Sequence, residues 1–268
     1  MPDWTRIVDW SKVEIYDLSQ PTSSRAPPFP TYPPFKVYWI KRLSDNRVNA
    51  QFIESPLHTG THFDGQQHFI TGGRDIASIP FDSLVGEGVI VDISDRVEDY
   101  DIYTKEMVLE ATQEGGQQIK PNDILIINTG YHRHAWCGEN PDEVKYNVKH
   151  PGPDVRFARW VIEMRFKWLG VDAVSQDHPL NTVIRNVRPD LVREAEGKWG
   201  RKIDELLPWP ENYQVMHAAL FPHEILHAEN LGGEIDKILN KRCIIGCFPF
   251  KFEGGESAFA RIVAFSSR

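Results

Sequence analysis

The run from His58 to His68 is the feature that most limits how this chain can fold. It holds three histidines and one aspartate within eleven residues, with Gly60 and Gly65 between them. Imidazole and carboxylate groups are the ligands that borderline cations such as Zn²⁺, Mn²⁺ and Fe²⁺ prefer. A structural segment has little use for this composition, so we expect the fold to gather these side chains around an ion.

The spacing within this run indicates how the ligands converge. On an extended backbone, alternate residues point to the same side, so His62 and Asp64 share one face. Gly60 permits a bend that brings His58 to the same ion. We therefore predict a divalent-metal site that is nucleated by His58, His62 and Asp64.

Composition and charge exclude several classes of partner. The chain has 268 residues, of which 41% are hydrophobic and 25% are charged, so one globular domain over residues 1–268 is expected. The net charge of -8 argues against nucleic acid or an anionic membrane as a partner. No stretch approaches a membrane span, and the first residues lack the apolar core of a signal peptide. A cytoplasmic location is therefore expected.

Hydrophobic patterning predicts strands that are interspersed with helices. The β-branched runs at 85–93 and 124–128 indicate buried strands, because a strand covered on both faces is apolar at every position. This alternation is typical of an α/β or α+β chain. Further strands are expected at 35–40, 48–53, 169–175, 243–250 and 258–265, and helices at 104–114, 153–167 and 189–199.

Prolines dominate the segment from about residue 20 to residue 36. Five prolines fall from Pro27 to Pro34, with Phe29 and Tyr32 among them and Phe35 directly after. A helix cannot accommodate this density of proline, so the segment is predicted to be an extended N-terminal arm. It is either a surface linker or a stiff flap that carries its aromatic side chains over a pocket or a neighbouring subunit.

A second histidine-rich run contains the formal HExxH match His223-Glu224-Ile225-Leu226-His227. On a helix, its two histidines would bind zinc and its glutamate would activate water, as in a metallopeptidase. Pro222 suits only a helix start, however, and the glycines after Asn230 stop any helix within about a turn. The motif is therefore a weaker candidate for the metal site than residues 58–68.

A third interpretation keeps the first run but changes the chemistry. His62 and Asp64 could join a distant histidine, such as His217, in the facial triad of a non-haem Fe(II) oxygenase. No arginine follows His217 until Arg242, so a partner for an oxo-acid cosubstrate is missing. Whether activity survives without dioxygen separates this alternative from a hydrolase.

Residues 58–68 match every fixed position of HxGTHxDxxxH, the motif of the metal-dependent cyclase family of hydrolases. That family includes bacterial kynurenine formamidase and isatin hydrolase. The resemblance extends to Asp17-Leu18-Ser19, to 121–130 and to His150-Pro151-Gly152. It implies an α/β fold with a mixed β-sheet flanked by helices, assembled as a homodimer or homotetramer.

The resemblance also implies roles for individual residues. His58, His62 and Asp64 align with the ligands of the first metal, and His68 aligns with the histidine that shuttles a proton or orients the site. His217 and Glu229 lie twelve residues apart, like the distal histidine and glutamate of the binuclear zinc formamidases. Isatin hydrolases hold a single manganese, so one or two ions of zinc or manganese are expected here.

These residues predict a metal-dependent hydrolase. A metal-bound hydroxide would attack a carbonyl carbon and cleave the C–N bond of an aryl formamide or a small cyclic amide. Aromatic residues near the motif, such as Tyr32, Phe63 and Phe69, favour a small aromatic or cyclic amide or lactone. A lactone or dienelactone hydrolase is the alternative on the same site. The extra stretch 183–213, relative to formamidases, is expected to reshape the pocket.

Overall fold

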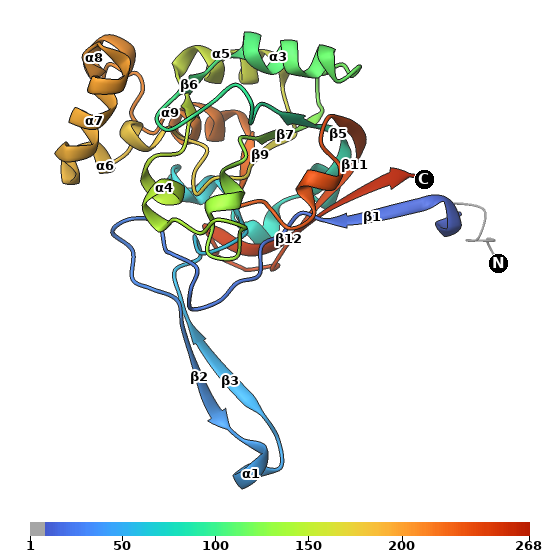
Figure 1. Ribbon diagram of the computed structural model, residues 1–268. Coiled ribbons are helices and arrows are strands. Elements are labelled where there is room, and N and C mark those ends of the chain that lie inside the picture. Colours follow the sequence, from blue (N-terminus) through green and yellow to red (C-terminus); the bar gives the residue numbers. More distant parts are fainter. Residues whose placement is uncertain (1–8) are drawn as a thin grey trace.

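A β-sheet that closes on itself organises the fold (Figure 1). The computed structural model describes residues 9–268, and within this range the main sheet has eight strands. Their order is β1 (Val13–Asp17), β12 (Ser257–Ser267), β11 (Lys241–Pro249), β5 (Val85–Asp92), β7 (Ile124–Asn128), β9 (Trp168–Val171), β10 (Leu226–Glu229) and β4 (His62–Asp64). Because β4 also pairs with β12, the sheet closes into a barrel and leaves β1 outside the ring. The expected α/β class with a mixed sheet is confirmed, and the sheet is closed rather than open.

The central strands are buried on both faces, which explains their unbroken apolar sequence. In β7, Ile124 and Ile126 belong to the core inside the barrel, whereas Leu125 and Ile127 pack against helices outside it. Strands β5, β7, β9 and β10 run parallel, an arrangement that needs helical cover. The predicted strands at 85–93 and 124–128 are confirmed within one residue.

Helices cover the outer face of these strands, and α3 and α5 lie across the barrel in Figure 1. The helices α3 (Lys105–Glu114), α5 (Val155–Met164) and α9 (Val215–Leu220) contribute to the outer core. α5 begins where the Asp154 carboxylate accepts hydrogen bonds from two backbone N–H groups of the first turn. The other elements are α2 (Phe81–Leu84), α4 (Glu143–Val148), α6 (Ile184–Val187), α7 (Pro189–Trp199), α8 (Ile203–Leu206), β6 (Ile102–Tyr103) and β8 (Gly152–Pro153).

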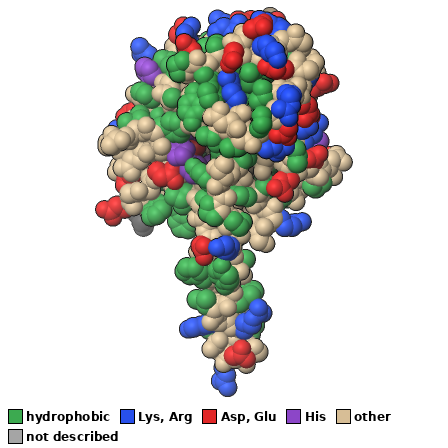
Figure 2. All heavy atoms as spheres, turned by 90° about the vertical axis from the view of Figure 1, so that its left-hand side faces the viewer, with side chains coloured by type: hydrophobic (Ala, Val, Ile, Leu, Met, Phe, Trp, Pro, Cys, Tyr) green, Lys and Arg blue, Asp and Glu red, His purple; other side chains and the backbone are tan. Residues whose placement is uncertain are grey.

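One antiparallel hairpin projects away from the body (Figure 1). It consists of β2 (Lys36–Lys41) and β3 (Ala50–Glu54), joined through α1 (Leu43–Asn46). Hydrophobic side chains run along it in Figure 2, and Ile40 and Phe52 are more than half exposed. The proline-rich segment that precedes the hairpin instead lies against the body, where Pro28 forms a bridge with Thr59.

Two expectations about membranes and targeting concern different parts of the chain. Among residues 9–268, no helix has both the length and the apolar character that a membrane crossing needs. The expected lack of a signal peptide rests on the first residues, and residues 1–8 lie outside the described part of the structure.

Candidate metal centre

Two neighbouring strands form the floor of the candidate site. β4 and β10 pair antiparallel, with His62 opposite Glu229 and Asp64 opposite His227. Because side chains alternate along a strand, these four residues share one face, while Phe63 lies in the core inside the barrel. The fold therefore places a square of potential metal ligands on the outer face of the barrel.

His58 reaches this square from the loop before β4. Gly60 in that loop has a φ of +64°, and a Cβ atom there would lie 3.0 Å from the Thr22 hydroxyl oxygen. The bend brings the His58 Nδ1 to 2.9 Å from the Asp64 Oδ1 and to 3.3 Å from the His62 Nε2. The structure therefore brings together the three ligands predicted from their spacing.

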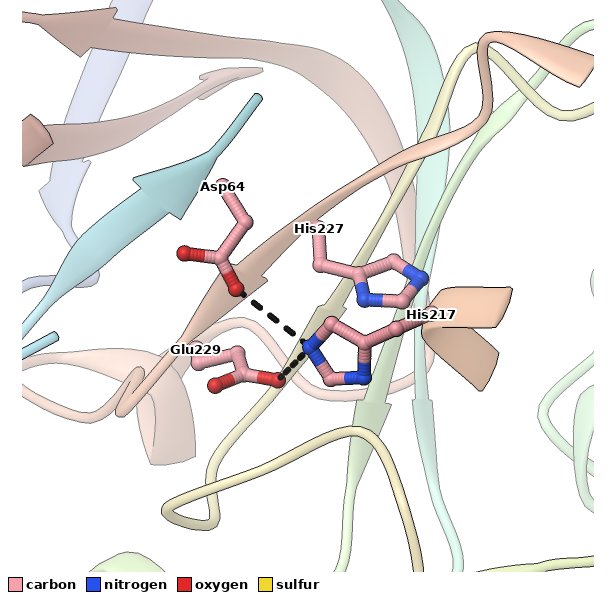
Figure 3. A group of neighbouring side chains, drawn as sticks. All are labelled: Asp64, His217, His227 and Glu229. Atoms are coloured by element: carbon pink, nitrogen blue, oxygen red, sulfur yellow. Dashed lines mark ion pairs between the residues drawn. The ribbon is translucent and has the colours of Figure 1, made fainter. Parts of the chain in front are cut away.

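His217 reaches the square from α9, on the other side of Asp64 (Figure 3). Its Nε2 lies 3.5 Å from the Asp64 Oδ2 and 3.6 Å from the Glu229 Oε1. The other Glu229 oxygen lies 3.5 Å from the His62 Nε2. Both carboxylates therefore lie between His62 and His217.

Hydrogen bonds outside the cluster orient two of its histidines. The His62 Nδ1 lies 2.8 Å from the Gly60 carbonyl oxygen, and the His217 Nδ1 lies 2.6 Å from the Asp177 carboxylate. When each Nδ1 donates its proton outward, each Nε2 presents its lone pair to the cluster. The Asp177 carboxylate therefore holds the His217 ring in place.

The electrostatics of the cluster favour a cation. Burial lowers the pKa of His58, but Asp64 and Glu256 outweigh it and raise the pKa to about 9. Burial likewise opposes the charged form of His217, yet its bonds to Asp177 and Asp64 raise the pKa to about 10. Without an ion, protons on the histidines must therefore balance the buried carboxylates.

Unpaired buried atoms provide a second test of whether a cation fits. Asp64 is fully buried, and its Oδ2 has no hydrogen-bond partner among residues 9–268. A buried carboxylate oxygen that accepts no hydrogen bond is costly unless it is a ligand. The nitrogen and oxygen donors gathered here suit a borderline divalent cation.

His68 lies beside the cluster and is held by a residue that the sequence analysis missed. The Glu256 Oε2 lies 2.8 Å from the His68 Nδ1 and 2.8 Å from the His58 Nε2. Burial raises the pKa of Glu256, but the two histidines outweigh it and lower the pKa to about 2. The only sequence signal was its place between Gly254-Gly255 and the last strand.

A small cavity opens onto this cluster. Its volume is about 50 Å³, and the proline-rich segment contributes Phe29 and Tyr32 to its wall. The ring centroids of Tyr32 and His58 are 5.8 Å apart. The cavity is lined further by His58, His68, Phe69, Val174, Ser175, Asp177, Thr182, Gln214, His217 and Glu229.

The HExxH motif does not form the helix that a metallopeptidase requires. His223 ends a short 3₁₀ turn and is exposed, and Glu224 has a φ of +60°. His227 lies in β10, so the two histidines share no helical face. Another histidine, His132, is buried outside the cluster, between Asp172 and Asp236.

Comparison with known proteins agrees with this arrangement. The family model described as "Putative cyclase" matches residues 16–178, more than half of the chain. Kynurenine formamidase from Bacillus cereus is 27% identical over 166 residues, which cover 61% of this chain and 70% of that protein.

Two solved structures share the fold. Isatin hydrolase A from Ralstonia solanacearum superposes with a TM-score of 0.74 at 21% identity, covering 94% of this chain and 92% of that one. A structure titled as a potential metal-dependent hydrolase with cyclase activity gives a TM-score of 0.64 at 19% identity, covering 94% and 98%. The chain therefore belongs to the cyclase family, as a member that resembles kynurenine formamidases in sequence and isatin hydrolases in fold.

Proposed function

We propose that this protein is a metal-dependent hydrolase that cleaves the C–N bond of an aryl formamide or a small cyclic amide. The observation that supports this most is the convergence of His58, His62, Asp64, His217 and Glu229 in one buried cluster. The named relatives are a formamidase and an isatin hydrolase, and this chain is a hydrolase of the same family.

Two overlapping groups of side chains would hold the metal. His58, His62 and Asp64 form one group, and Asp64 belongs with His217 and Glu229 to the other. Zinc or manganese suits both groups, because each combines imidazole with carboxylate. When bound, such an ion lowers the pKa of a coordinated water and polarises a substrate carbonyl.

His68 is the proposed proton-transfer residue. Its Nδ1 is bonded to the Glu256 carboxylate, which leaves its Nε2 to exchange a proton with the substrate. The side chain is partly exposed and lines the cavity, so it can reach a leaving nitrogen there. Glu256 is the positioning residue, because its carboxylate fixes the orientation of the His68 ring.

The wall of the cavity supports a flat, aromatic or cyclic substrate. Phe29, Tyr32 and Phe69 provide apolar surface opposite the polar cluster. This combination of a few convergent polar groups with aromatic walls is typical of small-molecule sites. An aryl formamide or an isatin-like lactam can place a carbonyl group at the polar cluster while its ring packs against the aromatic wall.

The first experiment measures bound metal per chain in protein purified without chelator, together with hydrolysis of formamides, cyclic amides and lactones. We expect His62→Ala to lose metal and activity, and Glu229→Ala to lose about half of the metal. His223→Ala is the matched control, because His223 is exposed and outside the cluster. Full metal content in His62→Ala would contradict the proposed site.

The same assay decides between the alternative functions. Cleavage of lactones but not of amides would favour a lactone or dienelactone hydrolase. The geometry of His62, Asp64 and His217 also suits the facial triad of an Fe(II) oxygenase, because both histidines approach Asp64. The hydrolase relatives favour hydrolysis, so we expect full activity in the absence of dioxygen.

A further inference from the structure

His227 is the most unusual buried side chain in the structure. It is fully buried, and neither of its ring nitrogens has a hydrogen-bond partner among residues 9–268. A buried polar group without a partner costs about 1–3 kcal/mol, so an apolar residue would serve a purely structural role better. Its neighbours Leu226 and Ala228 in β10 are apolar and belong to the core inside the barrel.

His227 lies among the potential metal ligands. It lies directly opposite Asp64 across the β4–β10 pair and two residues before Glu229. Residues opposite one another in an antiparallel pair have Cβ atoms about 5 Å apart on the same face. The ring centroids of His227 and His217 are 4.8 Å apart, and Figure 3 shows both rings beside the two carboxylates.

Distances within this group match those of a coordination site. One ligand atom from each of Asp64, His217, His227 and Glu229 lies within 4.8 Å of the other three. Ligands about 2.1 Å from one ion are at most about 4.2 Å apart, so small side-chain rotations would bring all four into contact with it.

We propose that His227 is a fourth protein ligand at the position formed by Asp64, His217 and Glu229. This inference rests on the proposed metal centre and adds a residue to it. A cation accepts a lone pair from one of the unpaired nitrogens of His227 and also satisfies the unpaired Asp64 oxygen. The main support for this inference is that His227 and Glu229 lie two residues apart on β10 and therefore point to the same face.

The fourth ligand makes the two metal positions unequal. The position at His58, His62 and Asp64 has three protein ligands, whereas the position at His227 has four. Zinc sites with four protein ligands are closed and structural, and sites with three keep a place for water or substrate. The metal position at His58 would therefore bind the substrate, and the position at His227 would have a structural role.

Cobalt titration of metal-free protein tests this inference, with bound Co²⁺ followed by elemental analysis and by visible absorption. The variants are His227→Gln and His227→Leu, and His223→Gln is the control on the same segment. We expect two ions in the wild type and the control. In both His227 variants, the second ion should bind at least about tenfold more weakly while the first is retained.

The outcomes separate this inference from the proposed function. If both variants bind two ions as tightly as the wild type, His227 is not a ligand, although the metal centre stands. If the wild type binds no metal, the proposed function itself fails. Should the variants not fold, the cobalt-loaded wild type is measured by NMR. Four shifted imidazole N–H signals support His227 as a ligand, and three contradict it.

Discussion

Glu256 links the two histidines at the edge of the site, and its charge is central to its role. One of its oxygens contacts both His58 and His68, and the pKa of Glu256 falls to about 2, so it remains an anion. The contact with this partly exposed carboxylate fixes the orientation of the His68 ring, which would transfer a proton to a leaving nitrogen. The residue therefore acts on proton transfer through His68.

We predict that Glu256→Gln lowers kcat about tenfold or more, because His68 loses the carboxylate that holds its ring. Glutamine keeps the shape of the side chain but removes its charge. Metal content should change little, and Glu253→Gln in the same loop is the control, because Glu253 is exposed. An unchanged kcat would show that the charge of Glu256 has no part in proton transfer.

The raised pKa values of His58 and His217 predict that metal binding displaces protons. Both histidines have pKa values well above neutrality in the metal-free cluster, at about 9 and about 10. A metal ligand must be deprotonated, so an ion entering near neutral pH should release about one to two protons per chain. Titration of weakly buffered protein with Zn²⁺ and a pH indicator measures this, and zero release contradicts it.

The same pKa values predict how pH affects the stability of metal-free protein. Because the folded pKa values exceed the unfolded value of about 6.5, the folded state binds protons more tightly. This stabilisation is complete below the unfolded pKa and is lost as the pH rises through about 9 to 10. The Tm of metal-free protein should therefore fall over that range, and metal-loaded protein should lack this component.

Among the elements, β5 shows how tightly the barrel is filled. A Cβ atom at Gly88 would lie 2.4 Å from the Ile124 carbonyl oxygen, a backbone atom of β7. At Gly86, two residues earlier on the same face, it would meet only the flexible Lys167 side chain. Glycine is therefore required at one position and replaceable at the other.

We predict that Gly88→Ala destabilises the protein by about 1–3 kcal/mol, because the methyl group must push β5 and β7 apart. Gly86→Ala is the matched control, and we expect its unfolding free energy to change by less than about 1 kcal/mol. Urea denaturation followed by circular dichroism measures both. Equal stability of the two variants would mean that the barrel can adjust at Gly88.

The elements also show what the sequence could reveal. β7 and α7 were predictable to the residue, because an unbroken apolar run and a proline-started amphipathic segment are local signals. β10 was not predicted, because the HExxH pattern was weighed only as a helix and no strand was expected there. His58, His62 and Asp64 could be found from their spacing, whereas Glu256 and His227 join the site only through strand pairing between distant segments.

At the scale of the whole molecule, the projecting hairpin exposes hydrophobic side chains that no other part of the described chain covers. Ile40, Phe52 and Ile53 are each more than half exposed on it. Phe52 and Ile53 are neighbours on β3, so the hairpin exposes apolar side chains on both of its faces. Exposed apolar surface of this kind marks an interaction site. We propose a second copy of this chain as the partner, in agreement with the expected homodimer or homotetramer.

We predict that the triple variant Ile40→Ser, Phe52→Ser, Ile53→Ser is a single chain. The substitutions remove the apolar surface that would be buried between copies. Analytical ultracentrifugation measures the mass, and Leu109→Ser on the exposed side of α3 is the control. A wild type that sediments as a single chain would contradict this proposal.

The closure of the ring between β4 and β12 has a consequence for how the protein is made. The Ser257 hydroxyl donates a hydrogen bond to Asp64 across 193 residues of sequence. During synthesis, the histidine-rich segment leaves the ribosome long before the strand that completes its surroundings. Contacts between such distant segments form slowly. We therefore expect the metal centre to mature only after β12 has been synthesised, as one of the later steps in folding.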